Sequence, residues 1–173
     1  MVSDEVLARL SSTSTPQSPV AVLPIPDPDP IDGHVVIGWG VRDPGNVGTL
    51  IRTAAAFGVG YAAGPDSVDP WAPKTLRAAA GGHFHTRFSR IDDLGTLPAH
   101  LVVATDARGE PVADVSIPEG AAVAVLVGDE ANGLPPSVLD EADVVASVPM
   151  SGEVESLNAA VAGAIVVYEL FGR

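Results

Sequence analysis

The chain has 173 residues, of which 46% are hydrophobic and none is cysteine, and 22 acidic against 9 basic side chains give a formal net charge of −13. This size and apolar content fit one compact domain of roughly 100–200 residues and exclude a disordered chain. The lack of cysteine excludes disulfide frameworks, thiolate metal sites and cysteine nucleophiles, and the acidic balance argues against a protein that grips nucleic acid by its overall field, although a local basic site stays open.

The sequence shows no sign of export or membrane insertion. No apolar run approaches the roughly 18 residues that a membrane span needs. The first ten residues include Asp4, Glu5 and Arg9, which fits neither a secretory signal nor a transit peptide. We therefore expect a cytoplasmic protein without a membrane partner.

Residues 1–32 are expected to form a tail or linker. A weak helical pattern over Ser3–Leu10 is followed by a Ser/Thr-rich stretch, and four prolines then alternate over residues 24–30. Proline at every second position excludes a helix and predicts an extended segment, in which Asp27 and Asp29 face solvent. The domain proper is predicted to cover residues 33–173.

From His34 onward, short apolar runs that read as buried strands alternate with segments of helical periodicity. The predicted strands cover His34–Trp39, Val59–Ala63, His83–Phe88, Leu101–Thr105, Ala122–Val127 and Asp143–Val148. The predicted helices cover Val47–Phe57, Pro73–Ala80, Pro135–Glu141 and Ser156–Phe171. This alternation predicts an α/β fold with a mostly parallel sheet and helices on both faces.

Parallel α/β folds bind ligands where the strands end, and the first candidate loop follows the first strand. Its two glycines allow a close backbone approach, and Asn46 stands where a helix N-cap would. Arg52 is a lone cation in an apolar helix pattern, so we expect it to meet a phosphate, a carboxylate or water, because burying it unpaired would be costly. The alternative is a self-satisfied joint of Asp43, Asn46 and Arg52.

Two further strand-exit loops combine glycine with polar residues. Residues 128–135 place Gly128 at a strand end, where a tight turn suits backbone hydrogen bonds to a flat ring; the alternative is an ordinary strand–helix turn. Residues 148–162 are expected to place Ser156 and Asn158 in the first turn of the last helix, which would form a ligand cradle. The alternative there is a cap followed by a core helix.

Several other motifs are absent or incomplete. The chain has no G-x-S-x-G elbow and no G-x-x-x-x-G-K-[ST] loop, and Gly38-Trp39-Gly40 lacks the third glycine of a dinucleotide fingerprint. His83 and His85 are two apart on a predicted strand, so they would point to opposite faces and make poor joint metal ligands. No metal site is expected.

Together, in order and spacing, the three loops resemble the signature motifs of the SpoU/TrmH group of RNA ribose 2′-O-methyltransferases, in the SPOUT superfamily. The resemblance rests on Asp43-Pro44-x-Asn46-x-Gly48-x-x-x-Arg52-Thr53-Ala54, on Gly128-x-Glu130-x-x-Gly133-Leu134 and on Pro149-Met150-x-Gly152-x-x-x-Ser156-Leu157-Asn158-x-x-Val161-Ala162. It spans about residues 34–171. Three motifs in the right order are specific, whereas any one alone would be weak.

The resemblance implies a sheet whose C-terminal part is threaded into a deep trefoil knot, an exception to the rule that chains are unknotted. It also implies S-adenosylmethionine (AdoMet) as cofactor and a homodimer with the active site near the interface. The reaction would transfer a methyl group to a ribose 2′-hydroxyl of rRNA or tRNA.

The resemblance also assigns roles to individual positions. The cofactor-binding positions are Gly128, Val148, Met150 and Leu157. The catalytic and positioning residues are Arg52, Asn46, Glu130, Ser156 and Asn158. Because the pKa of arginine stays above ~12, we expect Arg52 to hold the RNA phosphate next to the target and to orient the hydroxyl, rather than to act as a base.

Two departures from the family pattern stand out. Family members commonly carry an N-terminal RNA-binding domain that this chain is expected to lack, and the third motif reads Asn158-Ala159-Ala160-Val161 where Asn-Val-Ser-Val is more usual. A catalytic fragment, a late start and a small local basic patch stay open as accounts of the first. The alternative functions are a non-catalytic AdoMet- or RNA-binding relative and a nucleotide-binding oxidoreductase.

Overall fold

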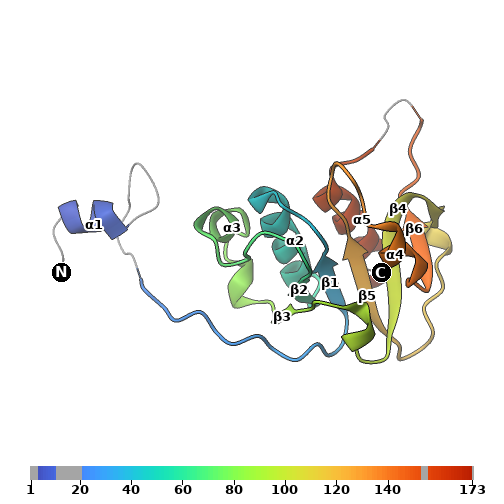
Figure 1. Cartoon of the computed structure of the whole chain (residues 1–173), viewed down its shortest axis with the longest axis horizontal. Coiled ribbons are helices and arrows are strands. Elements are labelled where there is room, and N and C mark those ends of the chain that lie inside the picture. Colours follow the sequence, from blue (N-terminus) through green and yellow to red (C-terminus); the bar gives the residue numbers. More distant parts are fainter. Residues whose placement is uncertain (1–3, 11–20, 153–155, 173) are drawn as a thin grey trace.

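Figure 1 shows the computed structural model of the chain, which describes residues 4–10, 21–152 and 156–172. The described strands form one six-stranded sheet in the order β3-β2-β1-β5-β4-β6, and all neighbouring strands run parallel. The strands are β1 (Val35–Gly38), β2 (Gly60–Ala63), β3 (Phe88–Arg90), β4 (His100–Pro111), β5 (Ala122–Val127) and β6 (Val144–Ser147).

Helices cover both faces of the sheet, as predicted. The helices are α1 (Asp4–Leu10), α2 (Pro44–Ala56), α3 (Pro73–Ala78), α4 (Pro136–Asp140) and α5 (Ala159–Phe171), with 3₁₀ turns η1 (Gly82–Phe84), η2 (Leu94–Thr96) and η3 (Val112–Asp114). Core residues of α2 and α5 pack on one face, and those of α4 and η2 pack on the other. In the part of the chain that the structure describes, no helix is long and apolar enough to cross a membrane.

The central strand β5 shows why the apolar runs form buried strands. Its predicted and observed bounds agree. Val123, Val125 and Val127 enter the core under α2 and α5, whereas Ala124 and Leu126 enter the core under α4. Because successive side chains alternate between faces, a strand covered on both faces must be apolar at every position.

The predicted strand over His83–Phe88 is wrong. This segment contains η1, and β3 begins only at Phe88. Gly81, with φ of +87°, turns the chain into η1. The His83 ring stacks on Phe88 at 4.9 Å, and its Nε2 lies 2.8 Å from the carbonyl oxygen of Pro70. Its ring contacts with Trp71 and Phe88 make this imidazole a packing residue, and burial lowers its pKa.

Both helices that carry signature motifs begin at residues other than those predicted. Helix α2 begins at Pro44, and its N-cap is Asp43, whose Oδ1 accepts the backbone N–H of Asn46 at 2.9 Å. The prediction of Asn46 as N-cap is therefore wrong, because Asp43 occupies that role three residues earlier. Helix α5 begins at Ala159 with Asn158 as its N-cap, so Ser156 lies before the helix rather than in its first turn.

Residues 21–32 form no helix or strand, as the alternating prolines predict, but their end is fixed to the sheet edge. Asp29 donates its backbone N–H to the carbonyl oxygen of Phe88, and its Oδ2 accepts the Phe88 N–H at 3.1 Å. Asp32 forms an ion pair with Arg87. Asp29 is exposed, as expected, yet it also pairs the edge strand β3 and so shields that edge.

Candidate active site

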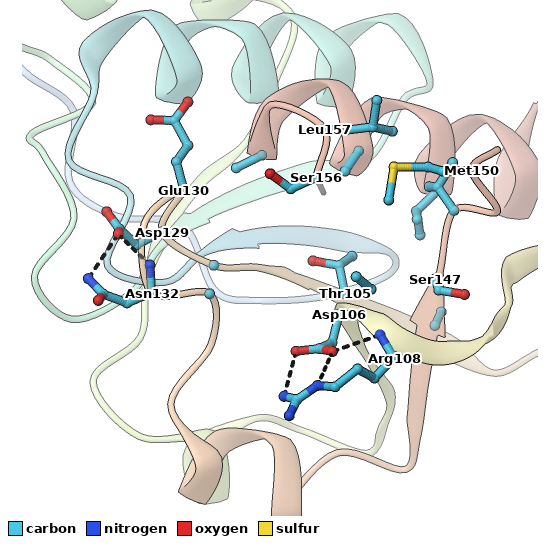
Figure 2. Close-up of a pocket in the computed structure, with 18 residues that line it drawn as sticks. Thr105, Asp106, Arg108, Asp129, Glu130, Asn132, Ser147, Met150, Ser156 and Leu157 are labelled. Atoms are coloured by element: carbon cyan, nitrogen blue, oxygen red, sulfur yellow. Dashed lines mark hydrogen bonds and ion pairs between the residues drawn. The ribbon is translucent and has the colours of Figure 1, made fainter. Parts of the chain in front are cut away.

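A cavity of about 360 Å³ lies at the carboxyl ends of β5 and β6 and beside residues 105–108 of β4, beneath the first turns of α5 (Figure 2). Its walls include the four predicted cofactor-binding residues, Gly128, Val148, Met150 and Leu157. Glu130 and Ser156 line the same cavity. The structure thus brings together residues of the second and third motifs, and this edge of a parallel sheet is where such folds bind ligands.

Gly128 lets the backbone run close beside the next part of its own loop. A Cβ at this position would lie 2.4 Å from the carbonyl carbon of Gly133 and 2.5 Å from the backbone nitrogen of Leu134. Asp129 holds the intervening turn, because its Oδ1 accepts the backbone N–H groups of Ala131 and Asn132 at 2.9 and 3.1 Å. Any side chain in place of Gly128 would displace this wall of the cavity.

Three polar side chains, one from each motif, meet beside the cavity. Oε1 of Glu130 accepts hydrogen bonds from the amide Nδ2 of Asn46 and, at 2.6 Å, from Nδ2 of Asn158. Asn158 also donates to Oδ1 of Asn46 at 3.0 Å, and its own Oδ1 accepts the backbone N–H of Val161 at 3.1 Å. Asn158 thereby caps α5 and fixes Glu130 and Asn46 with the same side chain.

Arg52 stands apart from this cluster. It is exposed on α2, does not line the cavity, and has no hydrogen bond or ion pair among the described residues. Six residues, about 1.7 helical turns, separate Arg52 from Asn46, so the two side chains leave α2 in different directions. The expectation that Arg52 avoids unpaired burial holds, whereas the alternative of a joint that includes Arg52 is wrong.

Asp106 and Arg108 line the cavity opposite Glu130 and Ser156, and sequence reasoning missed them (Figure 2). Arg108 donates from Nε to Oδ1 of Asp106 at 2.9 Å and from Nη2 to Oδ2 at 3.1 Å. The guanidinium holds the pKa of the Asp106 carboxyl below its usual range. The Asp106 side chain is 15% exposed and that of Arg108 is 82% exposed, so the cation lies at the mouth of the cavity.

A break in strand pairing places this ion pair at the cavity. The register of β4 against β6 shifts between Thr105 and Glu110, so the residues between them leave the regular ladder. Gly109 then passes the β6 backbone so closely that a Cβ would lie 2.4 Å from the carbonyl oxygen of Val145. In the sequence, Gly109 could have indicated this irregularity in β4, since glycine within a strand often marks a bulge. No cluster of three or more His, Asp or Glu side chains suited to a metal ion occurs among the described residues.

Fold and site define the class: an α/β protein with a small-molecule cavity and a polar cluster at the carboxyl edge of a parallel sheet. More particularly, the chain belongs to the SpoU rRNA methylase family, whose sequence model matches residues 33–168. Family membership removes the alternative of a nucleotide-binding oxidoreductase.

Named relatives agree with this assignment. The chain is 36% identical over 180 residues to the 23S rRNA (guanosine(2553)-2′-O)-methyltransferase RlmP of Bacillus subtilis, covering 99% of this chain and 72% of RlmP. Two other curated relatives are covered over 65% and 55% of their length. The SpoU methyltransferase AviRb of Streptomyces viridochromogenes, in complex with AdoMet, superposes with a TM-score of 0.85 at 27% identity over 99% of this chain and 71% of AviRb. An AdoMet-bound rRNA methyltransferase of Sinorhizobium meliloti gives 0.72 at 33% identity over 82% of this chain and 56% of that one.

Proposed function

We propose that this chain is an AdoMet-dependent methyltransferase that modifies a ribose 2′-hydroxyl of rRNA or tRNA. One observation carries the proposal: residues of all three motifs meet in a bonded cluster of Asn46, Glu130 and Asn158 beside the cavity. RlmP, at 36% identity, is named for this reaction, and AviRb and the S. meliloti enzyme are described with AdoMet bound.

The residues of the cavity fit AdoMet. Its volume of about 360 Å³ falls in the range of small-molecule sites. Val148, Met150 and Leu157 offer apolar contact to the adenine ring, and the backbone around Gly128 offers hydrogen bonds to its edge. Arg108 offers a cation to the methionine carboxylate. When bound, AdoMet supplies a methyl group already activated on a sulfonium.

The chain's own task is then to align two reactants and to assist the loss of a proton from a weak nucleophile. The amides of Asn46 and Asn158 hold the Glu130 carboxylate in a set orientation beside the cavity. Ser156 offers a hydroxyl at the same wall. Arg52 holds an RNA phosphate and orients the 2′-hydroxyl, in keeping with its exposure to solvent.

A second copy of the chain completes the site in this proposal. Helix α5 leaves the large apolar side chains of Val161 and Tyr168 45% and 52% exposed. Arg52 is exposed on α2, which packs against α5. Pairing of these helices between two copies would bury the apolar face and bring Arg52 towards the cavity of the partner chain. Arg52 does not line the cavity of its own chain.

The trefoil knot is also part of the proposal. Strand β6 lies at the edge of the sheet, yet α5 packs back against α2, β5 and η3. Threading of the final segment through the loop after β4 would account for this return. Single-molecule stretching tests the knot, because a tightened knot leaves the fully extended chain shorter than its residue number allows; full extension would contradict it.

The proposed domain division places catalysis in residues 33–173, with residues 1–32 as a leading segment, in agreement with the family match over 33–168. Because the proposed substrate is rRNA or tRNA, we also propose that the enzyme acts in the cytoplasm.

The test begins with calorimetric titration of AdoMet into the full chain. We expect one AdoMet per chain, with binding abolished by Leu157→Asp and retained by Leu76→Asp, a matched change at an exposed leucine outside the cavity. Methyl transfer is then followed with labelled AdoMet and total RNA. A 2′-O-methyl group makes the adjacent phosphodiester resistant to alkali, so an alkali-sensitive product contradicts ribose methylation. AdoMet binding without transfer to any RNA would favour the non-catalytic relative.

A further inference from the structure

The charge of the catalytic domain is divided between its two halves. Residues 33–90 contain six of the nine Lys and Arg residues and three acidic residues, a formal net of +3. Residues 91–173 contain two basic and fourteen acidic residues, a net of −12. In Figure 1 the first half forms β1 to β3 with α2 and α3, whereas β4, β6 and α4 lie at the other end of the sheet.

Three of the six cations of the first half, Arg52, Lys74 and Arg77, are exposed on α2 and α3. Lys74 and Arg77 are exposed and three residues apart, so they share one face of α3. Helix α3 and η1 pack against α2 so closely that a Cβ at Gly82 would lie 3.2 Å from the Cα of Arg52. The acidic residues that precede α3 in the sequence are Asp66 and Asp69, and Oδ1 of Asp69 accepts the backbone N–H of Trp71 at 2.9 Å.

An exposed aromatic ring accompanies these cations. Phe84 is 78% exposed, the second highest value among the large apolar side chains of the described residues. It lies in η1, which is firmly held: Gly82 is buried against α2, and the His83 ring packs on Trp71 at 5.0 Å and on Phe88 at 4.9 Å. Phe84 is therefore presented to solvent by a fixed turn, not by a loose loop.

We propose that Arg52, Lys74, Arg77 and Phe84 form an RNA-docking surface, on which phosphates meet the cations and an unpaired base stacks on Phe84. Cations beside an exposed aromatic ring are the combination that binds single-stranded RNA, because phosphates pair with the cations and every base has a face that can stack. An overall net charge of −13 does not oppose this, since −12 of the charge lies in residues 91–173. This proposal rests on the proposed function, and it identifies the part of the protein that would receive the RNA substrate.

The test is the binding of a short fluorescein-labelled single-stranded RNA to the full chain, followed by fluorescence anisotropy between roughly 50 and 200 mM salt. We expect Lys74→Glu/Arg77→Glu to weaken binding at least tenfold and to reduce the salt dependence, with a slope smaller by about 1 to 2. Phe84→Ala should weaken binding about tenfold with an unchanged slope, and Phe84→Tyr should restore it. Arg90→Glu, which reverses a single cation on the edge strand, should alter binding less than twofold.

AdoMet titration of the same variants separates the two proposals. Variants that bind AdoMet as the unmodified chain does but bind RNA unchanged would overturn the docking surface alone, as would an unmodified chain that binds AdoMet and no RNA at low salt. Loss of AdoMet binding in the unmodified chain would instead overturn the proposed function. If Phe84→Ala weakens RNA binding only by converting a dimer to a monomer in light scattering, the ring belongs to a contact between copies and the surface is wrong.

Discussion

Tyr61 is a fully buried side chain whose hydroxyl has no hydrogen-bond partner among the described residues. A Cβ at Gly38 would lie 2.7 Å from this hydroxyl, so the tip of the ring fills the space that the glycine leaves. An unpaired buried hydroxyl opposes folding, because it has lost its bonds to water without replacing them.

Tyr61→Phe should therefore raise the free energy of unfolding by about 1 kcal/mol in chemical denaturation near neutral pH. Burial also raises the pKa of Tyr61, so the stability of the unmodified chain should fall as the pH rises above about 10, the value of an unfolded tyrosine. Tyr61→Phe removes that component. Tyr168→Phe is the matched control, since Tyr168 is half exposed and its loss should change little. A less stable Tyr61→Phe chain would contradict the account.

Arg108 allows a second test at the scale of one residue. Arg108→Gln should weaken AdoMet binding about tenfold in calorimetry, because it removes the cation proposed to face the methionine carboxylate. It should leave the binding of 5′-methylthioadenosine, which lacks the amino-acid end, unchanged. Arg90→Gln is the control, because Arg90 is similarly exposed and pairs with Asp92 away from the cavity. Equal weakening of both ligands would mean that Arg108 only supports the loop.

At the scale of elements, the packing of α2 against α3 depends on Gly48. A Cβ there would lie 2.4 Å from the Cβ of Ala78 and 2.8 Å from the backbone nitrogen of Ala79. Alanine has the higher helix propensity by about 1 kcal/mol, yet Gly48→Ala should lower the free energy of unfolding by about 1–3 kcal/mol, because the two helices must separate. Thr49→Ala, at the next, exposed position, should have little effect. A stabilised Gly48→Ala chain would show that α3 can move away from α2 at little energetic cost.

Periodicity predicted most elements because the buried strands are apolar at every position, as β5 is from Ala122 to Val127. It failed over His83–Phe88, where glycine turns and ring packing outweigh a short alternating pattern. It could not assign the cap of α2, because Asp43 and Asn46 are both good N-caps and only the path of the chain decides between them.

The site was predictable only where its residues belong to motifs. The motifs named Asn46, Glu130 and Asn158, but their shared hydrogen bonds join residues 84 and 112 positions apart, a distance that no local pattern spans. Asp106 and Arg108 were not predicted as site residues, because they reach the cavity through a register shift in β4 that the hydrophobic pattern does not indicate. The division of charge was countable in the sequence, but the total of −13 concealed it.

At the scale of the whole molecule, the distance of Arg52 from its own cavity predicts how two inactive variants behave together. Arg52→Ala and Leu157→Asp should each abolish methyl transfer to RNA. In a mixed dimer, the cavity of the Arg52→Ala chain is intact and receives Arg52 from the Leu157→Asp chain, so one of two sites works. Random reassociation of equal amounts should therefore restore about one quarter of the normal activity. The control mixes Leu157→Asp with Gly128→Ala, both in the cavity, where the two variants must stay inactive because neither chain brings an intact cavity. If the Arg52→Ala mixture also stays inactive while light scattering shows mixed dimers, Arg52 acts within its own chain, and the proposal of a site shared between copies is wrong.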